Sequence, residues 1–176
     1  MSGGRTADRG ALELLKQHGI VNPPVPVEDL ARNEGIQVVR TQAPGTESGF
    51  ILSDGQRIVI GINSRNSRKR QRFTIAHELG HWRLLHDGRP LIVDHTIRIN
   101  KRDEVSSAAT DREEIEANAF AAALLMPEEM VRAAVAREVN LGIDSRDVLI
   151  QTLAGEFDVS GEAMGFRLIN LGVFSS

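Results

Sequence analysis

"TIAHELGHWRLLH", residues 74–86, places three histidines and one glutamate within ten residues. His77 and His81 are four positions apart, and Glu78 directly follows the first of them. On a helix, residues four apart share one face and lie about 6 Å from each other, so both imidazoles can bind one metal ion. Glu78 would lie beside that ion as a general base, and Gly80 would allow another helix to pack closely.

A metal site of this type needs a third protein ligand, and the neighbouring histidine does not supply it. His86 lies five residues after His81 and leaves the shared helix face, so it is a candidate for the wall of the site. Without a third ligand, the pattern also fits an amphipathic helix whose two histidines are half-buried and hydrogen-bonded. A carboxylate on a second predicted helix is the better candidate for the ligand. That helix offers Glu113, Glu114 and Glu116.

The second helix is predicted to begin at Thr110 and to end before Pro127. Thr110 and Glu113 fit a Ser/Thr-x-x-Glu capping box. The first turn of a helix also favours acidic residues, because the helix dipole is positive there. Glu113 therefore has a structural reason to be present and is the weakest of the three ligand candidates.

Glu114 shares a helix face with Asn118, four positions further on. Ala117 and Ala121 are small enough to let the two helices approach closely. Asn118 would then hydrogen-bond a ligand histidine and fix the orientation of its ring. We therefore favour Glu114 as the third ligand, with Glu116 as the alternative.

The composition limits the class of protein and the chemistry of the site. The 176 residues are 41% hydrophobic and 26% charged, carry a net charge of −3 and include no cysteine. A metal must therefore be bound by histidine and carboxylate groups, and a set of two histidines and one glutamate favours zinc over manganese or iron. No apolar run approaches the roughly 20 residues that span a bilayer, and the polar start lacks a signal segment. We expect a cytoplasmic protein with no membrane partner.

The rest of the chain predicts an α+β fold with a small N-terminal sheet. Two apolar runs flank "SDGQ", a turn containing Asp-Gly that favours a β-hairpin. Strands are expected at 36–41, 48–52 and 57–62, with a short strand "HTIRI" within a polar loop at 87–109. Helices are expected at 11–18, 27–35, 67–85, 110–126, 127–139, 145–157 and 161–172.

Three blocks of sequence, "RFTIAHELGHWRLLH", "RDEVSS" and "EEIEANAFAAALLMP", occur in this order and resemble the ImmA/IrrE family of metallo-endopeptidases. The resemblance covers residues 63–130, with weaker similarity on both sides. It implies a compact zincin-like core with zinc bound by His77, His81 and Glu114, and with Glu78 as general base. It also implies cleavage of an Xre-type helix-turn-helix repressor, or of an antitoxin, which relieves repression in mobile elements or in a stress response.

One departure from zincins concerns the transition state. The chain contains no tyrosine, so the phenol that often stabilises the oxyanion is absent. The tetrahedral intermediate then needs another donor. His86 and Arg83 are the two candidates.

The chain is predicted to consist of a zincin-like metallopeptidase domain at 1–140 and a helical appendage at 141–176. The appendage has helix-turn-helix-like spacing, with "DVS" as its turn and Ser160 as the N-cap of the second helix. A helix that reads DNA needs several basic residues, whereas this one offers Arg167 alone against Glu162. We therefore expect the appendage to pack on the core or help to bind the substrate, and DNA binding is the weaker reading.

A basic patch precedes the metal motif. It consists of Arg65, Arg68, Lys69, Arg70 and Arg72. Cations at a helix N-terminus oppose the helix dipole, so local stability does not explain them. The patch is either a solvated face or a surface that attracts an acidic segment of a partner, or DNA bound to that partner.

Two functions remain open from the sequence. The first is an intracellular zinc endopeptidase of narrow specificity, whose substrate adds as a strand to the edge of the hairpin at 48–52 or 57–62. The second is a non-proteolytic regulator that binds a repressor, an antitoxin or DNA through the zinc fold. Glu78 favours the enzyme, because a purely structural zinc site has no use for a carboxylate at that position.

Overall fold

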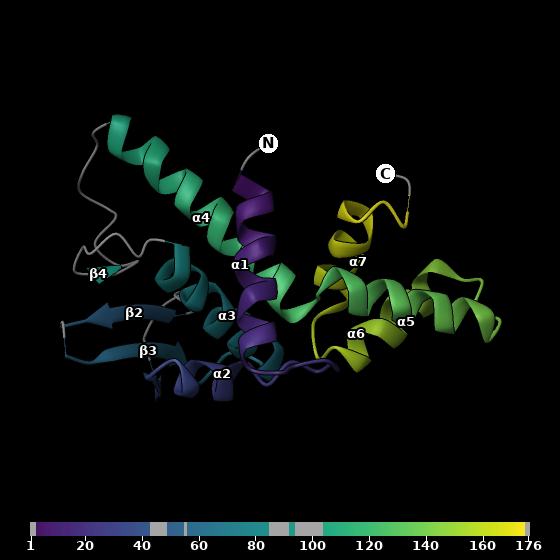
Figure 1. Ribbon diagram of the computed structural model, residues 1–176, viewed down its shortest axis with the longest axis horizontal. Helices are drawn as coiled ribbons and strands as arrows, with labels where there is room; N and C mark the ends of the chain where they lie inside the picture. The colour runs from purple at the N-terminus through teal and green to yellow at the C-terminus, as the bar shows by residue number, and fades with distance from the viewer. Residues whose placement is uncertain (1–2, 43–48, 55, 85–91, 94–103, 175–176) are drawn as a thin grey trace.

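The structure is a computed structural model that describes residues 3–42, 49–54, 56–84, 92–93 and 104–174. Over these residues the chain forms seven helices and one four-stranded sheet, so the predicted α+β class is confirmed (Figure 1). The helices are α1 (Gly3–Gln17), α2 (Val27–Asn33), α3 (Arg68–Leu84), α4 (Glu104–Leu125), α5 (Glu128–Asn140), α6 (Arg146–Glu156) and α7 (Gly161–Asn170). The strands are β1 (Ile36–Thr41), β2 (Gly49–Ser53), β3 (Ile58–Asn63) and β4 (Ile92–Val93).

The sheet has the strand order β1-β3-β2-β4. β2 and β3 are antiparallel, with Ser53 opposite Ile58, so the predicted hairpin is confirmed. β1 pairs with β3 in parallel, which makes β3 an interior strand. β2 is also an interior strand, because it pairs with β4 on its other side. The expectation that 48–52 or 57–62 offers a free edge is therefore wrong, because a hairpin signal does not reveal partners elsewhere in the chain. The predicted strand "HTIRI" lies outside the described residues.

α4 is the central helix, with α3 packed along it on the side of the sheet and α1 crossing it (Figure 1). α1 begins at Gly3 rather than at the predicted Ala11. Small residues on its inner face allow this contact: Ala7 is fully buried, and the Gly10 Cβ position lies 3.5 Å from the ring of Phe120. The part of α1 before Ala11 packs through alanine and glycine and lacks the large apolar residues that sequence periodicity detects, whereas the predicted part contains the buried Leu14 and Leu15.

α4 itself begins earlier than predicted. It starts at Glu104, so Thr110 lies inside the helix and the predicted capping box with Glu113 is wrong. The Ser/Thr-x-x-Glu pattern marks a helix start only where no helical turn precedes it. The other end agrees with the prediction, since α4 ends at Leu125 and Pro127 lies directly before α5.

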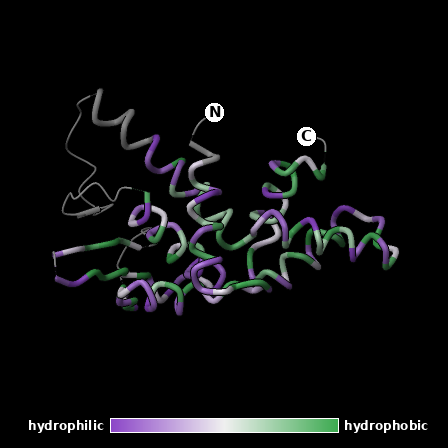
Figure 2. Tube along the Cα trace, in the orientation of Figure 1, coloured by the Kyte–Doolittle hydropathy of each residue, from purple (hydrophilic) through white to green (hydrophobic). Residues whose placement is uncertain are grey.

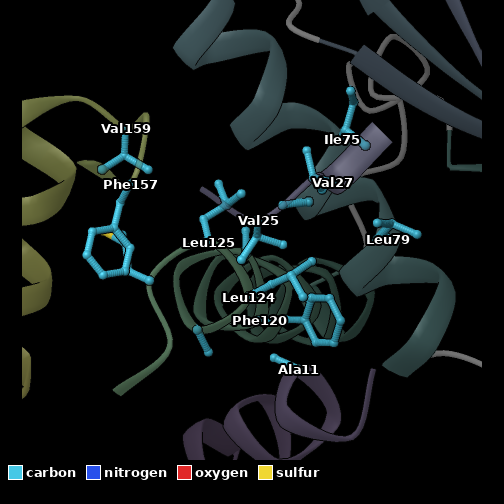
Figure 3. Close-up of a cluster of buried hydrophobic side chains, with 14 of the residues drawn as sticks. Ala11, Val25, Val27, Ile75, Leu79, Phe120, Leu124, Leu125, Phe157 and Val159 are labelled. Carbon is cyan, nitrogen blue, oxygen red and sulfur yellow. The ribbon is translucent and has the colours of Figure 1, made fainter. Parts of the chain in front are cut away.

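The hydrophobic core is one continuous cluster around α4. Figure 3 shows Phe120 and Leu124 on α4 between Leu79 of α3, Ala11 of α1 and Phe157, which follows α6. Hydrophobic residues also recur along β2, β3 and the C-terminal helices (Figure 2). Phe157 is fully buried, so the C-terminal helices pack on the same core as the metal motif. The domain boundary at 140/141 stays a prediction.

Among the described residues, no helix has both the length and the apolar composition that a membrane-spanning helix needs.

Candidate metal centre

The contact between α3 and α4 is close because small residues meet there. A Cβ atom on Gly80 would lie 3.1 Å from the Ala117 Cα and carbonyl oxygen, and 3.2 Å from the Phe120 Cβ. Ala117 and Ala121 are fully buried. The expectation that Gly80 and these alanines let the helices approach is confirmed. Polar side chains one turn away on each helix are thereby brought within reach of one another.

Three such side chains meet at one point. His77 Nε2 lies 3.0 Å from His81 Nε2, and the Glu114 carboxylate lies 3.4 Å from the first and 3.1 Å from the second. Two ligand atoms that are each about 2.0–2.1 Å from one ion in tetrahedral geometry are roughly 3.3 Å apart. The three residues therefore fit a metal ion with nitrogen and oxygen ligands, and their donor atoms all lie within 4.8 Å of one another.

Asn118 supports one of these rings from α4. Its Oδ1 lies 3.0 Å from His77 Nδ1, which is the predicted contact. When Nδ1 donates to this oxygen, the Nε2 of a neutral imidazole carries the lone pair that a metal needs. His81 is 1% exposed, and its ring meets that of His77 edge to face at 4.6 Å. Both rings are thus oriented by their surroundings.

The charge state of Glu114 suits a cation. Burial by itself raises the pKa of this carboxyl, but hydrogen bonds from His77 and His81 and, when these imidazoles are protonated, their positive charge lower it far below its ordinary value; a bound metal cation would take the place of those protons. The carboxylate is therefore ionised throughout the physiological range. An ionised oxygen donor beside two imidazoles is a typical set of metal ligands.

The structure separates the three candidate carboxylates. Glu116 accepts a hydrogen bond from Arg112 Nε at 2.9 Å, an ordinary pair of residues four apart on a helix surface. Glu114 alone among the three glutamates forms ion pairs with both histidines. The geometry agrees with the choice of Glu114, whose role as a ligand remains a prediction.

The remaining candidates differ in position. Glu78 directly follows His77 on α3, and its side chain is 1% exposed. Arg83 donates to Gln17 Oε1 at 2.8 Å and pairs with Glu34 at 3.2 Å, so its guanidinium holds α3 to α1 and to the end of α2. His86 lies outside the described residues.

Phe73 is a residue of this centre that the sequence analysis missed. Its ring is stacked on that of His77, with 6.3 Å between the ring centroids and 27° between the planes. The signal was available, because Phe73 precedes His77 by four residues and therefore shares its helix face. It suggests an apolar wall on one side of the centre.

The chain is similar in sequence to a known domain family and in fold to a solved protein. The family model of the IrrE N-terminal-like domain (peptidase M78) matches residues 31–169. A solved Mycobacterium tuberculosis transcriptional regulator has a similar fold, with a TM-score of 0.63 and 22% sequence identity over 93% of this chain. That match covers 46% of the regulator, so this chain spans about half its length. No curated protein sequence matches the chain. The resemblance predicted from the sequence is confirmed, and the chain belongs to the IrrE N-terminal-like domain family.

Proposed function

We propose that this protein is a zinc-dependent endopeptidase. The convergence of His77, His81 and Glu114 carries the proposal, with Glu78 buried on the same helix as the two histidines. Membership of a peptidase family supports it. We propose that the enzyme acts in the cytoplasm.

Each side chain then has a separate task. Zinc would supply Lewis acidity, which makes water a stronger acid and a peptide carbonyl a better electrophile. Glu78 takes the proton of the attacking water and delivers it to the nitrogen of the leaving amine. Asn118 keeps the His77 ring oriented through Nδ1, and Glu114 neutralises part of the charge of the cation.

The substrate class comes from the family resemblance. We propose an Xre-type helix-turn-helix repressor, or an antitoxin of similar design, whose cleavage relieves repression. A cytoplasmic endopeptidase must spare other proteins, so we expect one cut in one or a few regulators.

The test is to incubate the metal-loaded protein with the Xre-like regulator encoded nearest its gene, alongside a Glu78→Gln variant. Mass spectrometry should find one discrete cut with the wild type, slowed by about 10²–10⁴-fold in the variant. Metal content and thermal stability should be equal in the two proteins. Undiminished cleavage by the variant contradicts the role of Glu78. Stable binding without a cut by both proteins would favour a non-proteolytic regulator.

A further inference from the structure

A groove of about 560 Å³ lies between the start of α3, the second half of α4 and α7. We call it the α7 groove; its lining includes Lys69, Phe73, Asn118, Met126, Glu162 and Phe166. Two of these residues also belong to the candidate metal centre, because Asn118 is hydrogen-bonded to His77 and Phe73 is stacked on the same ring. The groove is therefore continuous with that centre.

The floor and one edge of the groove are apolar. Met126 and Val159 are buried beneath it, while Phe166 on α7 is 62% exposed at its edge. The neighbouring apolar residues of α7, Met164 and Leu168, are fully buried in the core. An aromatic ring that stays in water beside an apolar groove gains from being covered by another apolar side chain.

Four of the five residues of the basic patch identified in the sequence divide into two pairs. Arg68 and Arg72 both form ion pairs with Asp158, at 3.0 Å and 3.3 Å, and so hold the turn between α6 and α7. Lys69 and Arg70 are exposed and line the α7 groove. The ion pairs with Asp158 give Arg68 and Arg72 a reason to be present despite the helix dipole, whereas Lys69 adds positive charge to one end of the groove.

The opposite side of the groove presents the carboxylate of Glu162 on α7, because Arg167, the other charged α7 residue of the lining, is 9% exposed and donates to the Met126 carbonyl oxygen. A ligand is therefore favoured when its negative group lies towards α3 and its apolar group lies against Phe166. A nucleic acid backbone is negative throughout and would meet Glu162 unfavourably. An acidic and apolar peptide segment fits both charge and polarity.

We propose that the α7 groove binds the segment of the protein substrate that flanks the scissile bond, and that it selects an acidic residue close to a large apolar one. The place of this segment next to a scissile bond rests on the proposed peptidase function. The peptide preference itself is a binding property and can be measured without cleavage.

The experiment uses the full-length, metal-loaded Glu78→Gln protein and three fluorescent peptides that differ at two positions. One carries Glu and Phe, the second Lys and Phe, and the third Glu and Ser. Fluorescence anisotropy at low salt should show the Glu-Phe peptide binding about tenfold tighter than either of the others. Equal affinities for all three peptides would overturn the proposal.

Two further substitutions locate the binding site. Lys69→Glu should reverse the preference, so that the Lys-Phe peptide binds tighter than the Glu-Phe peptide. Phe166→Ala should remove the preference for Phe over Ser without changing the preference for charge. Arg9→Glu on α1 and Leu141→Ala after α5 are matched controls, because both residues are exposed and lie outside the groove. All five proteins should have the same melting temperature to within a few degrees.

The outcomes separate this proposal from the peptidase function. An unchanged peptide preference in Lys69→Glu overturns the groove proposal, as does a duplex DNA probe that binds more tightly than the Glu-Phe peptide. A dimer that Phe166→Ala dissociates would assign the groove to a second copy and also overturn it. When Glu78 is intact, regulator cleavage that Lys69→Glu and Phe166→Ala both leave unaltered overturns the groove proposal and supports the peptidase function. If the peptides show the expected preferences but no regulator is cleaved, the groove is supported as a peptide-binding site and the peptidase function is contradicted.

Discussion

Two regions of this protein bury charged or ionisable side chains where helices meet, and they do so in different ways. Where α3 crosses α4, the donor atoms of His77, His81 and Glu114 lie within 4.8 Å of one another. Where α7 joins the rest of the protein, Arg72 and Arg167 donate to backbone carbonyl groups instead. Side chains directed at one shared point suggest a ligand, whereas side chains directed at carbonyl groups stabilise the fold.

The second region shows how such a structural charge is accommodated. Arg72 donates to the carbonyl oxygens of Asp158, at 3.1 Å, and Val25, at 2.9 Å, while Arg167 donates to that of Met126 at 2.9 Å. Burial lowers the pKa of both guanidinium groups, and nearby carboxylates oppose the shift. A guanidinium remains protonated under such conditions, so these residues have no lone pair with which to bind a metal ion.

The sharpest test of this contrast removes one carboxylate from the α3–α4 crossing. Glu114→Ala should weaken zinc binding on the order of 10³-fold, because one of three protein ligands is lost. Glu116→Ala is the matched control and should change zinc affinity little, since Glu116 pairs with Arg112. Competition with a chromophoric chelator measures both affinities. A larger loss in Glu116→Ala would move the third ligand to that residue.

A second test weakens the junction of α7. Arg72→Met should lower the free energy of unfolding by about 2–4 kcal/mol, because two carbonyl oxygens and the Asp158 carboxylate lose a largely buried donor. Arg68→Met removes a partner of the same carboxylate, but Arg68 is 80% exposed against 12% for Arg72. Its loss should cost about 0.5 kcal/mol or less. Urea denaturation distinguishes the two, and equal losses would contradict the structural role of Arg72.

Asn118 offers a test of intermediate size at the crossing. Asn118→Ala should lower zinc affinity by about 10–100-fold, because the His77 ring loses the acceptor that orients it. Asn170→Ala on α7 is the control, since Asn170 also lines the α7 groove but is not hydrogen-bonded to either histidine in the described contacts. Calorimetric titration with zinc would show the difference. Equal affinities in the two variants would remove Asn118 from the site.

The smallest expected effects distinguish the packing of the two regions. Gly80→Ala should cost about 1–2 kcal/mol, because the new methyl group meets the Ala117 backbone at 3.1 Å. Gly155→Ala on α6 should instead stabilise the fold by about 0.5–1 kcal/mol, since nothing lies within 4 Å and alanine favours the helix. Thermal unfolding gives both signs. Stabilisation by Gly80→Ala would show that α3 and α4 leave room for a methyl group at Gly80.

Elements defined by neighbouring residues could be predicted from the sequence. The expected helix at 67–85 corresponds to α3 at Arg68–Leu84, and Ser160 is the N-cap of α7, where its side chain accepts from Ala163 N. Both depend on contacts within one or two turns, so local composition determines them. The start of α4 was missed because a capping pattern also occurs within helices, as at Thr110.

The same distinction applies to the candidate site. The positions of His77, Glu78 and His81 on one helix could be predicted from their spacing, because spacing along a helix fixes which residues lie together. Three other contacts could be established only from the folded chain. Glu114 meets the histidines, β1 pairs with β3, and Arg72 reaches Asp158, which lies 86 positions further along the chain. These contacts depend on how closely helices and strands pack. That packing is set by buried small residues such as Gly80 and Ala117, whose effect appears only when both partners are in place.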